Sequence, residues 1–177
     1  MILRRLSELR QDHRGLALME FAVLLPVMLI LFLGGYQLSQ ASVCKRRVTI
    51  VTRAIADLVS RYETMTPADV DFVLDASEQI MAPYNVTATQ ERVSLIKVDS
   101  TRKVTVVWSK GRRITARTVG TFSGLPSSMA IADSYYIFAE VVYDYHPMDG
   151  VFSYPLTLTQ SLFMVPRKSD FVDCPTC

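Results

Sequence analysis

A stretch of 24 residues without a charged side chain, from Phe21 to Cys44, constrains this chain more than any other feature. A helix needs about 20 mainly apolar residues to cross the hydrocarbon core of a bilayer, so this stretch is long enough to span one. Arginines precede it, and Lys45, Arg46 and Arg47 follow it. The charge of the flanks therefore does not by itself decide which end faces the cytoplasm. The sequence predicts one membrane-spanning helix.

The composition of the rest is that of an ordinary folded domain. The chain has 177 residues, half of them hydrophobic and a fifth charged, which excludes a disordered chain and a polytopic membrane protein. Residues 1–15 account for the net charge of +2, and the remainder is neutral. A neutral body disfavours nucleic-acid binding. Three cysteines and two histidines disfavour a disulfide scaffold, a metal centre and a histidine-based active site.

A carboxylate near the start of the apolar segment needs an explanation. Glu20 follows Gly15 by five positions and directly precedes Phe21. A charged side chain in an apolar run is costly, and such residues are usually paired or functional. The alternative is that Glu20 lies at the level of the lipid headgroups and extends its carboxylate into water. Pro26, further along the run, removes one helical hydrogen bond and predicts a bend.

This segment resembles the class III signal of type IV pilins and pseudopilins. The residues that carry the resemblance are Arg14-Gly15-Leu16, the Glu20-Phe21 pair, Pro26 and the apolar run that follows. Over residues 14–38 the match is narrower, to the TadE/TadF-like minor pseudopilins of the tight-adherence (Flp pilus) system. The size of the chain disfavours a major Flp pilin, because those subunits are very short.

The resemblance implies a set of roles for these residues. A prepilin peptidase would cleave between Gly15 and Leu16, so that Glu20 becomes the fifth residue of the mature protein. Glu20 and Phe21 would then set the axial register, with the Glu20 carboxylate paired to the amino terminus of a neighbouring subunit. The expected partners are this peptidase, other pilus subunits and the inner-membrane assembly platform. No cofactor and no enzymatic activity are expected.

The resemblance also settles the expected orientation and domain division. Residues 1–15 would form a cytoplasmic leader, residues 16–44 a transmembrane helix, and residues 45–177 a periplasmic, pilin-like domain. The protein would lie in the bacterial inner membrane, or enter a surface pilus. Its expected function is the assembly or initiation of an adhesive Flp-type pilus.

Three alternatives remain open from the sequence. The first is an uncleaved single-pass membrane protein with a periplasmic binding domain. The second is a secreted protein cleaved after Ala41, with Ser42 as its first mature residue. The third is a thiol enzyme that uses Cys174 and Cys177. That role normally requires such a pair to open a helix, and no residue follows Cys177 in this sequence.

Helical periodicity continues past the uncharged stretch, through residues 45–63. It predicts a single helix from about Leu16 to Tyr62, whose outer half packs on the domain. The apolar positions of this outer half are Val48, Val51, Ile55, Leu58, Val59 and Tyr62.

A second helix is predicted to begin after Thr66. Thr66 can cap it, Pro67 suits its first position, and Asp69 complements its positive end. Pro83 is expected to end it. Its apolar face comprises Val70, Val73, Leu74, Ser77 and Met81.

Alternating apolar residues predict strands in the second half of the chain. The expected strands lie around residues 93–97 and 104–108 and over residues 134–145 and 156–165. Val93, Leu95 and Lys97 should share one face of the first strand, and Val104, Val106 and Trp108 should repeat this in the second. Residues 146–155, with Pro147, Gly150 and Pro155, are expected to form a turn. The fold class is therefore α+β, with about four antiparallel strands joined by adjacent connections and packed on the helices.

The remaining features indicate structure rather than chemistry. Cys174 and Cys177 could form a disulfide in an oxidising compartment, which leaves Cys44 as a free thiol, an intermolecular link or the partner of one of them. His146, between Asp144 and Asp149, is typical of a turn. Residues 109–132 are basic, and could contact anionic lipid or an acidic partner, or form a solvated loop.

Overall fold

The computed structural model of the chain describes residues 14–147 and 155–177. Asp149, Gly150 and most of the predicted leader lie outside the described residues. The chain forms two compact units, Met1–Gln40 and Ala41–Cys177.

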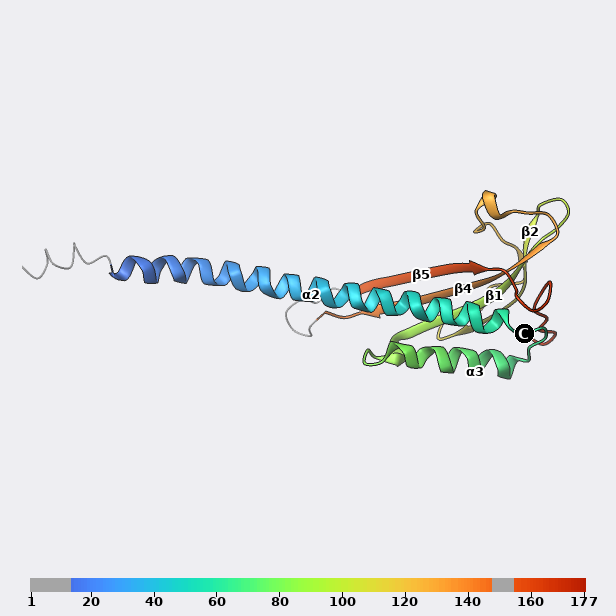
Figure 1. Ribbon diagram of the computed structural model, residues 1–177, viewed down its shortest axis with the longest axis horizontal. Coiled ribbons are helices and arrows are strands. Elements are labelled where there is room, and N and C mark those ends of the chain that lie inside the picture. The colour runs from blue at the N-terminus through green and yellow to red at the C-terminus, as the bar shows by residue number, and fades with distance from the viewer. Residues whose placement is uncertain (1–13, 148–154) are drawn as a thin grey trace, which may run out of the picture. The chain divides into compact units, whose positions relative to one another are not determined.

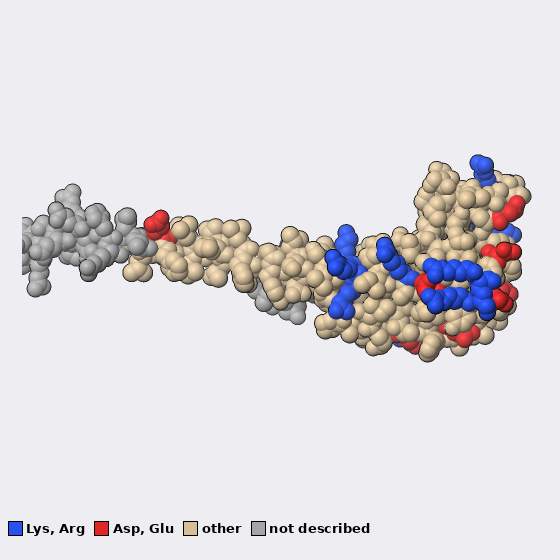
Figure 2. Space-filling view, viewed as in Figure 1, with Lys and Arg blue, Asp and Glu red and all other residues tan. Residues whose placement is uncertain are grey.

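One long helix, α2 (Arg14–Ser60), contributes to both units and contains Pro26. In the first unit its large apolar side chains are exposed, among them Leu18, Phe21 and Phe32. Within the described residues, the segment Leu18–Ser60 contains one helix that is long and apolar enough to cross a membrane. Figure 2 shows a long stretch of this helix in tan, the colour of residues other than Lys, Arg, Asp and Glu.

In the second unit, α2 carries a buried apolar stripe on one side, although Val43 and Ile50, outside this stripe, are exposed. The residues of this stripe recur every three or four positions, so they fall on one face of the helix and pack into the core. They are Cys44, Val48, Val51, Ile55 and Val59, all fully buried or nearly so. The predicted apolar face is confirmed, although the helix ends at Ser60, two residues before Tyr62.

Helix α3 (Pro67–Glu78) begins as predicted, with a complete capping box. The Thr66 side chain accepts a hydrogen bond from the Asp69 backbone N–H at 3.3 Å, and the Asp69 carboxylate accepts one from the Thr66 N–H at 2.8 Å. The Thr66 hydroxyl also donates to the Asp69 carboxylate at 2.7 Å, and this bond, together with the one from the Thr66 N–H, holds the pKa of Asp69 below its ordinary value. Figure 1 shows α3 alongside the last turns of α2. Its buried face includes Val70, Val73, Leu74 and Ser77, and a short 3-10 turn, η1 (Gln79–Met81), follows it.

The sheet is antiparallel and open, which together with the helices confirms the α+β class. Its strands are β1 (Thr89–Val98), β2 (Val104–Arg112), β3 (Gly120–Thr121), β4 (Ser134–Tyr145) and β5 (Leu156–Met164). The four longer strands were predicted, and the two-residue β3 was not. The order β3-β2-β1-β4-β5 corrects the expected connections, because the chain passes from β2 across to the far side of β1. There β4 pairs with β1 over ten residues, from Ser134 opposite Val98 to Tyr143 opposite Thr89.

Two apolar clusters lie on opposite faces of this sheet. The larger one packs the sheet against the helices and includes Val93, Leu95 and Trp108. The smaller one lies on the other face and consists of Ile96, Val98, Val106, Phe122, Tyr136 and Phe138.

The predicted shared face of Val104, Val106 and Trp108 is wrong. The register shifts between Leu95 and Ile96, so Leu95 pairs with Trp108 while Ile96 pairs with Val106. Such a bulge places one extra residue in a strand and reverses the faces beyond it. Trp108 consequently joins the larger cluster, and Val106 joins the smaller one.

The capping box makes a first testable prediction. We expect Thr66→Ala to lower the free energy of unfolding by about 1 kcal/mol, because the substitution leaves the Asp69 N–H without its partner. The fluorescence of Trp108, the single tryptophan, provides the measurement during denaturant unfolding of the full chain in detergent. Thr49→Ala is the control, since the Thr49 hydroxyl bonds only to the Lys45 carbonyl of its own helix. Equal losses in the two variants would contradict a capping role.

Candidate functional site

The residues of the predicted N-terminal site all lie on helix α2. The backbone of Arg14, Gly15 and Leu16 forms its first turn, and Glu20 follows one turn later. Gly15 and Glu20 are exposed, as are Phe21 and Pro26. The structure thus spreads these residues along one helix and does not gather them into a pocket.

Glu20 lies beside apolar neighbours. Its side chain borders a shallow surface formed with Met19, Val23 and Leu24. None of the ion pairs found among residues 14–147 and 155–177 involves Glu20. Packing within the chain does not explain the glycine at position 15 either, because an added Cβ would meet nothing within 4 Å.

The basic stretch predicted in residues 109–132 is neutralised by carboxylates of the same domain. Lys110 Nζ lies 2.8 Å from the Asp71 carboxylate and donates a hydrogen bond to the Pro67 carbonyl at 3.0 Å. Arg112 pairs with two acids of α3, Asp75 and Glu78. Figure 2 shows basic and acidic side chains next to one another on the visible face of the second unit. These cations join α3 to the sheet, so the stretch is not simply a solvated loop.

The opposite face of the sheet holds a second group of ion pairs. The Glu140 carboxylate accepts hydrogen bonds from Arg92 Nε at 2.8 Å and from Arg117 Nη2 at 2.6 Å. Burial acts to raise the pKa of Glu140, but the two arginines outweigh it and lower that pKa. The Arg117 guanidinium also lies over the rings of Phe122 and Phe138, 5.1 and 5.3 Å from their centroids. This arrangement closes one side of the smaller apolar cluster.

A buried carboxylate on β1 was not predicted from the sequence. Glu91 has no exposed surface, and neither of its carboxylate oxygens has a hydrogen-bond partner among the described residues. Burial, and then the nearby charge of Glu78, raise the pKa of Glu91 to about 8, against the attraction of Arg113 and Arg112. Its place two residues before Val93, on the helix-facing side of the strand, is the signal that could have revealed it.

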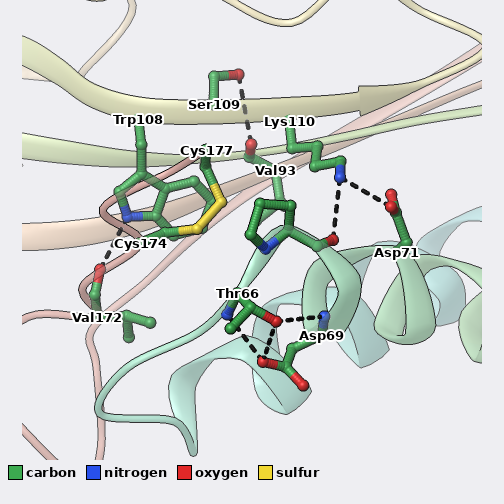
Figure 3. Close-up of a disulfide and its surroundings, with 11 residues drawn as sticks. Thr66, Asp69, Asp71, Val93, Trp108, Ser109, Lys110, Val172, Cys174 and Cys177 are labelled. Atoms are coloured by element: carbon green, nitrogen blue, oxygen red, sulfur yellow. Dashed lines mark hydrogen bonds and ion pairs between the residues drawn. A yellow bond between two sulfur atoms is a disulfide. The ribbon is translucent and has the colours of Figure 1, made fainter.

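The C-terminal tail closes the core at one end of the second unit. The Asp173 N–H donates to the Glu63 carbonyl at 3.0 Å, and the Met65 N–H donates to the Asp173 carbonyl at 2.8 Å. Trp108 Nε1 donates to the Val172 carbonyl at 2.8 Å, as Figure 3 shows.

The cysteines are divided between the tail and the helix. Cys174 and Cys177, three positions apart in the sequence, form a disulfide. Cys44 is free and buried in the core. Of the three states considered for Cys44, the structure shows the free thiol. The ring closed by the disulfide is short, so the backbone hydrogen bonds of the tail, and not the crosslink, join it to the rest of the domain.

The second prediction concerns Glu91 and the pH dependence of stability. With a folded pKa of about 8 against an ordinary 4.5, folded Glu91 holds a proton that the unfolded chain has already released. The free energy of unfolding should therefore fall as the pH rises from about 4.5 to about 8, by an amount on the order of a few kcal/mol. Glu91→Gln should remove most of this fall.

The measurement is denaturant unfolding of the full chain in detergent, followed by Trp108 fluorescence at about pH 5.5 and about pH 8.5. Glu63→Gln, at an exposed acid, serves as the control and should keep the fall. A pH dependence that is the same in Glu91→Gln and in the unchanged protein would refute the prediction.

Comparison with known proteins concerns the helical segment. The model of one family, described as TadE-like protein, matches residues 15–57, which lie entirely within α2. No curated protein and no solved structure matches the chain significantly. The predicted resemblance is thereby confirmed for this segment, and residues 15–57 are consistent with a TadE-like protein of the tight-adherence system.

Proposed function

We propose that this chain is a minor pseudopilin, which a prepilin peptidase cleaves between Gly15 and Leu16 and which acts in the assembly or initiation of an adhesive Flp-type pilus. One observation carries the proposal. The family match begins at residue 15, the last residue of the proposed leader, and runs through Glu20 and the uncharged stretch. The mature protein would thus begin with the apolar part of α2.

The position of the proposed cleavage suits proteolysis. A protease requires extended backbone at the bond it cuts, and Gly15 imposes little conformational restriction there. The bond lies in the first turn of α2, where backbone N–H groups have no helical partner. Opening this turn costs less than opening the interior of the helix. Gly15 makes no contact that a side chain would disturb, so its role can be tested without a packing defect.

Cleavage would create a positive charge one helical turn from Glu20. The new α-amino group lies on Leu16, four positions before Glu20 in the helix. In the hydrocarbon region both charges are costly unless they are paired. A pair between Glu20 of one subunit and the amino terminus of its neighbour neutralises both and fixes their relative height. Phe21 would pack in the same contact, and Pro26 would bend the helix beyond it.

The placement in the cell follows from the same proposal. Residues 1–15 are cytoplasmic, residues 16–44 span the inner membrane, and residues 45–177 form the periplasmic domain, which either stays there or enters the pilus. The Cys174–Cys177 disulfide supports this orientation, because disulfides persist in oxidising compartments. The partners are the prepilin peptidase, other pilus subunits and the assembly platform.

The third prediction concerns the mature amino terminus. We expect mass spectrometry of the protein from cells with the peptidase to find Leu16 as the first residue, and cells without the peptidase to retain the leader. Gly15→Leu should abolish cleavage. Gly34→Ala should not, although both glycines lie on the same helix and neither has a contact that a Cβ would disturb.

A different first residue of the mature protein would contradict the proposal and indicate another function. An uncut chain, beginning at Met1 or Ile2 in both strains, would indicate a single-pass membrane protein with a periplasmic binding domain. A chain beginning at Ser42 would indicate a secreted protein.

The fourth prediction concerns Glu20. We expect Glu20→Gln to be cleaved normally but to reduce incorporation into the assembly about tenfold or more, because the neighbour's amino terminus loses its ionic partner. Glu20→Asp, which keeps the negative charge, should be incorporated into the assembly better than Glu20→Gln. Crosslinking of membrane fractions, with mass spectrometry of the mature terminus, measures both steps. Normal assembly of the Glu20→Gln protein would rule out the pairing.

A further inference from the structure

A cavity of about 550 Å³ lies in the second unit, between the start of β4 and the C-terminal tail. Two segments about thirty positions apart in the sequence form its walls. Ile131, Asp133 and Tyr135 contribute from the first, and Val165, Asp170 and Phe171 from the second.

The apolar part of the cavity is open to solvent. The Tyr135 and Phe171 rings lie against each other, with their centroids 5.3 Å apart. Ile131, Val165 and Phe171 are 63%, 60% and 44% exposed. Large apolar side chains grouped around a cavity in this way are typical of a binding surface.

The charges around the cavity are unbalanced. Asp133 and Asp170 line it, and neither takes part in an ion pair among the described residues. Two neighbouring cations are already paired with other acids, Arg167 with Asp57 at 2.7 Å and Lys168 with Glu63 at 3.5 Å, and Lys97, over the Tyr135 ring, has no ion pair among the described residues. Two carboxylates therefore remain available to a ligand, next to aromatic rings.

We propose that this cavity binds an arginine side chain of a partner protein, flanked there by apolar residues. Carboxylates form their strongest hydrogen bonds with such cations, and aromatic faces attract them as well. The exposed apolar side chains would cover the flanking residues and exclude water from the contact. The inference goes beyond the proposed pseudopilin function and does not depend on cleavage after Gly15.

The test uses the full-length protein in detergent micelles and fluorescently labelled peptides. One set carries a central arginine between apolar residues of varied size, and a matched set carries citrulline, which keeps the shape of arginine but not its charge. We expect fluorescence anisotropy to show that the arginine peptides bind. Their citrulline counterparts should bind more weakly, by about tenfold or more.

Variants of the protein locate the binding. Asp133→Asn and Asp170→Asn should each weaken binding of the arginine peptides several-fold. Asparagine tolerates the left-handed backbone of Asp133 (φ 57°), and Trp108 fluorescence verifies folding. Asp144→Asn removes a negative charge at the other end of β4, keeps an oxygen that can accept the Thr157 hydrogen bond, and should leave binding unchanged.

Three outcomes would overturn the proposal. These are the absence of binding by any arginine peptide, equal binding of arginine and citrulline peptides, and unchanged binding in both asparagine variants. Displacement of the bound peptides by neutral oligosaccharides would instead assign the cavity to a carbohydrate. Because cleavage is measured separately at Leu16, failure here leaves the proposed function standing.

Discussion

The apolar surface of α2 changes character along its length, and the rest of the structure depends on that change. Up to Val43 large apolar residues are exposed, whereas from Cys44 onward most of them form one buried stripe and Ile50 stays exposed. A helix that is apolar all round is stable only in a non-aqueous environment or against other helices, but a stripe needs one covering layer. In the second unit, α3, the sheet and the tail provide that layer, and all of them contribute to the larger cluster.

Ion pairs then determine how α3 is joined to the sheet. Its acids Asp71, Asp75 and Glu78 face cations at the end of β2 and just beyond it. Burial of Glu91, and then the negative charges of Glu78 and Asp75, raise the pKa of Glu91 to about 8, against the attraction of Arg113 and Arg112. One arrangement of charges therefore both fixes the helix and makes the stability of the domain sensitive to pH.

Local sequence patterns predicted the structural features that are determined by residues close together in the sequence. The stripe of α2, the capping box at Thr66 and the extents of β4 and β5 all follow from spacing and residue type within a few positions. The bulge after Leu95, the pairing of β1 with β4 and the burial of Glu91 depend on segments far apart in the sequence, so they could not be read from it. The cavity beside Tyr135 was missed for the same reason, whereas the roles of Gly15 and Glu20 remain predictions.

The two parts of the chain suit different kinds of recognition. The family match ends at residue 57, within α2, so what it supports concerns the helix. Contacts between apolar helices are non-directional, and in the proposed assembly Glu20 would add register but little choice of partner. Choice among partners requires directional groups held in a shaped site, because a wrong partner then leaves a charge unpaired. Asp133 and Asp170, held beside the Tyr135 and Phe171 rings, meet that requirement in the described part of the domain.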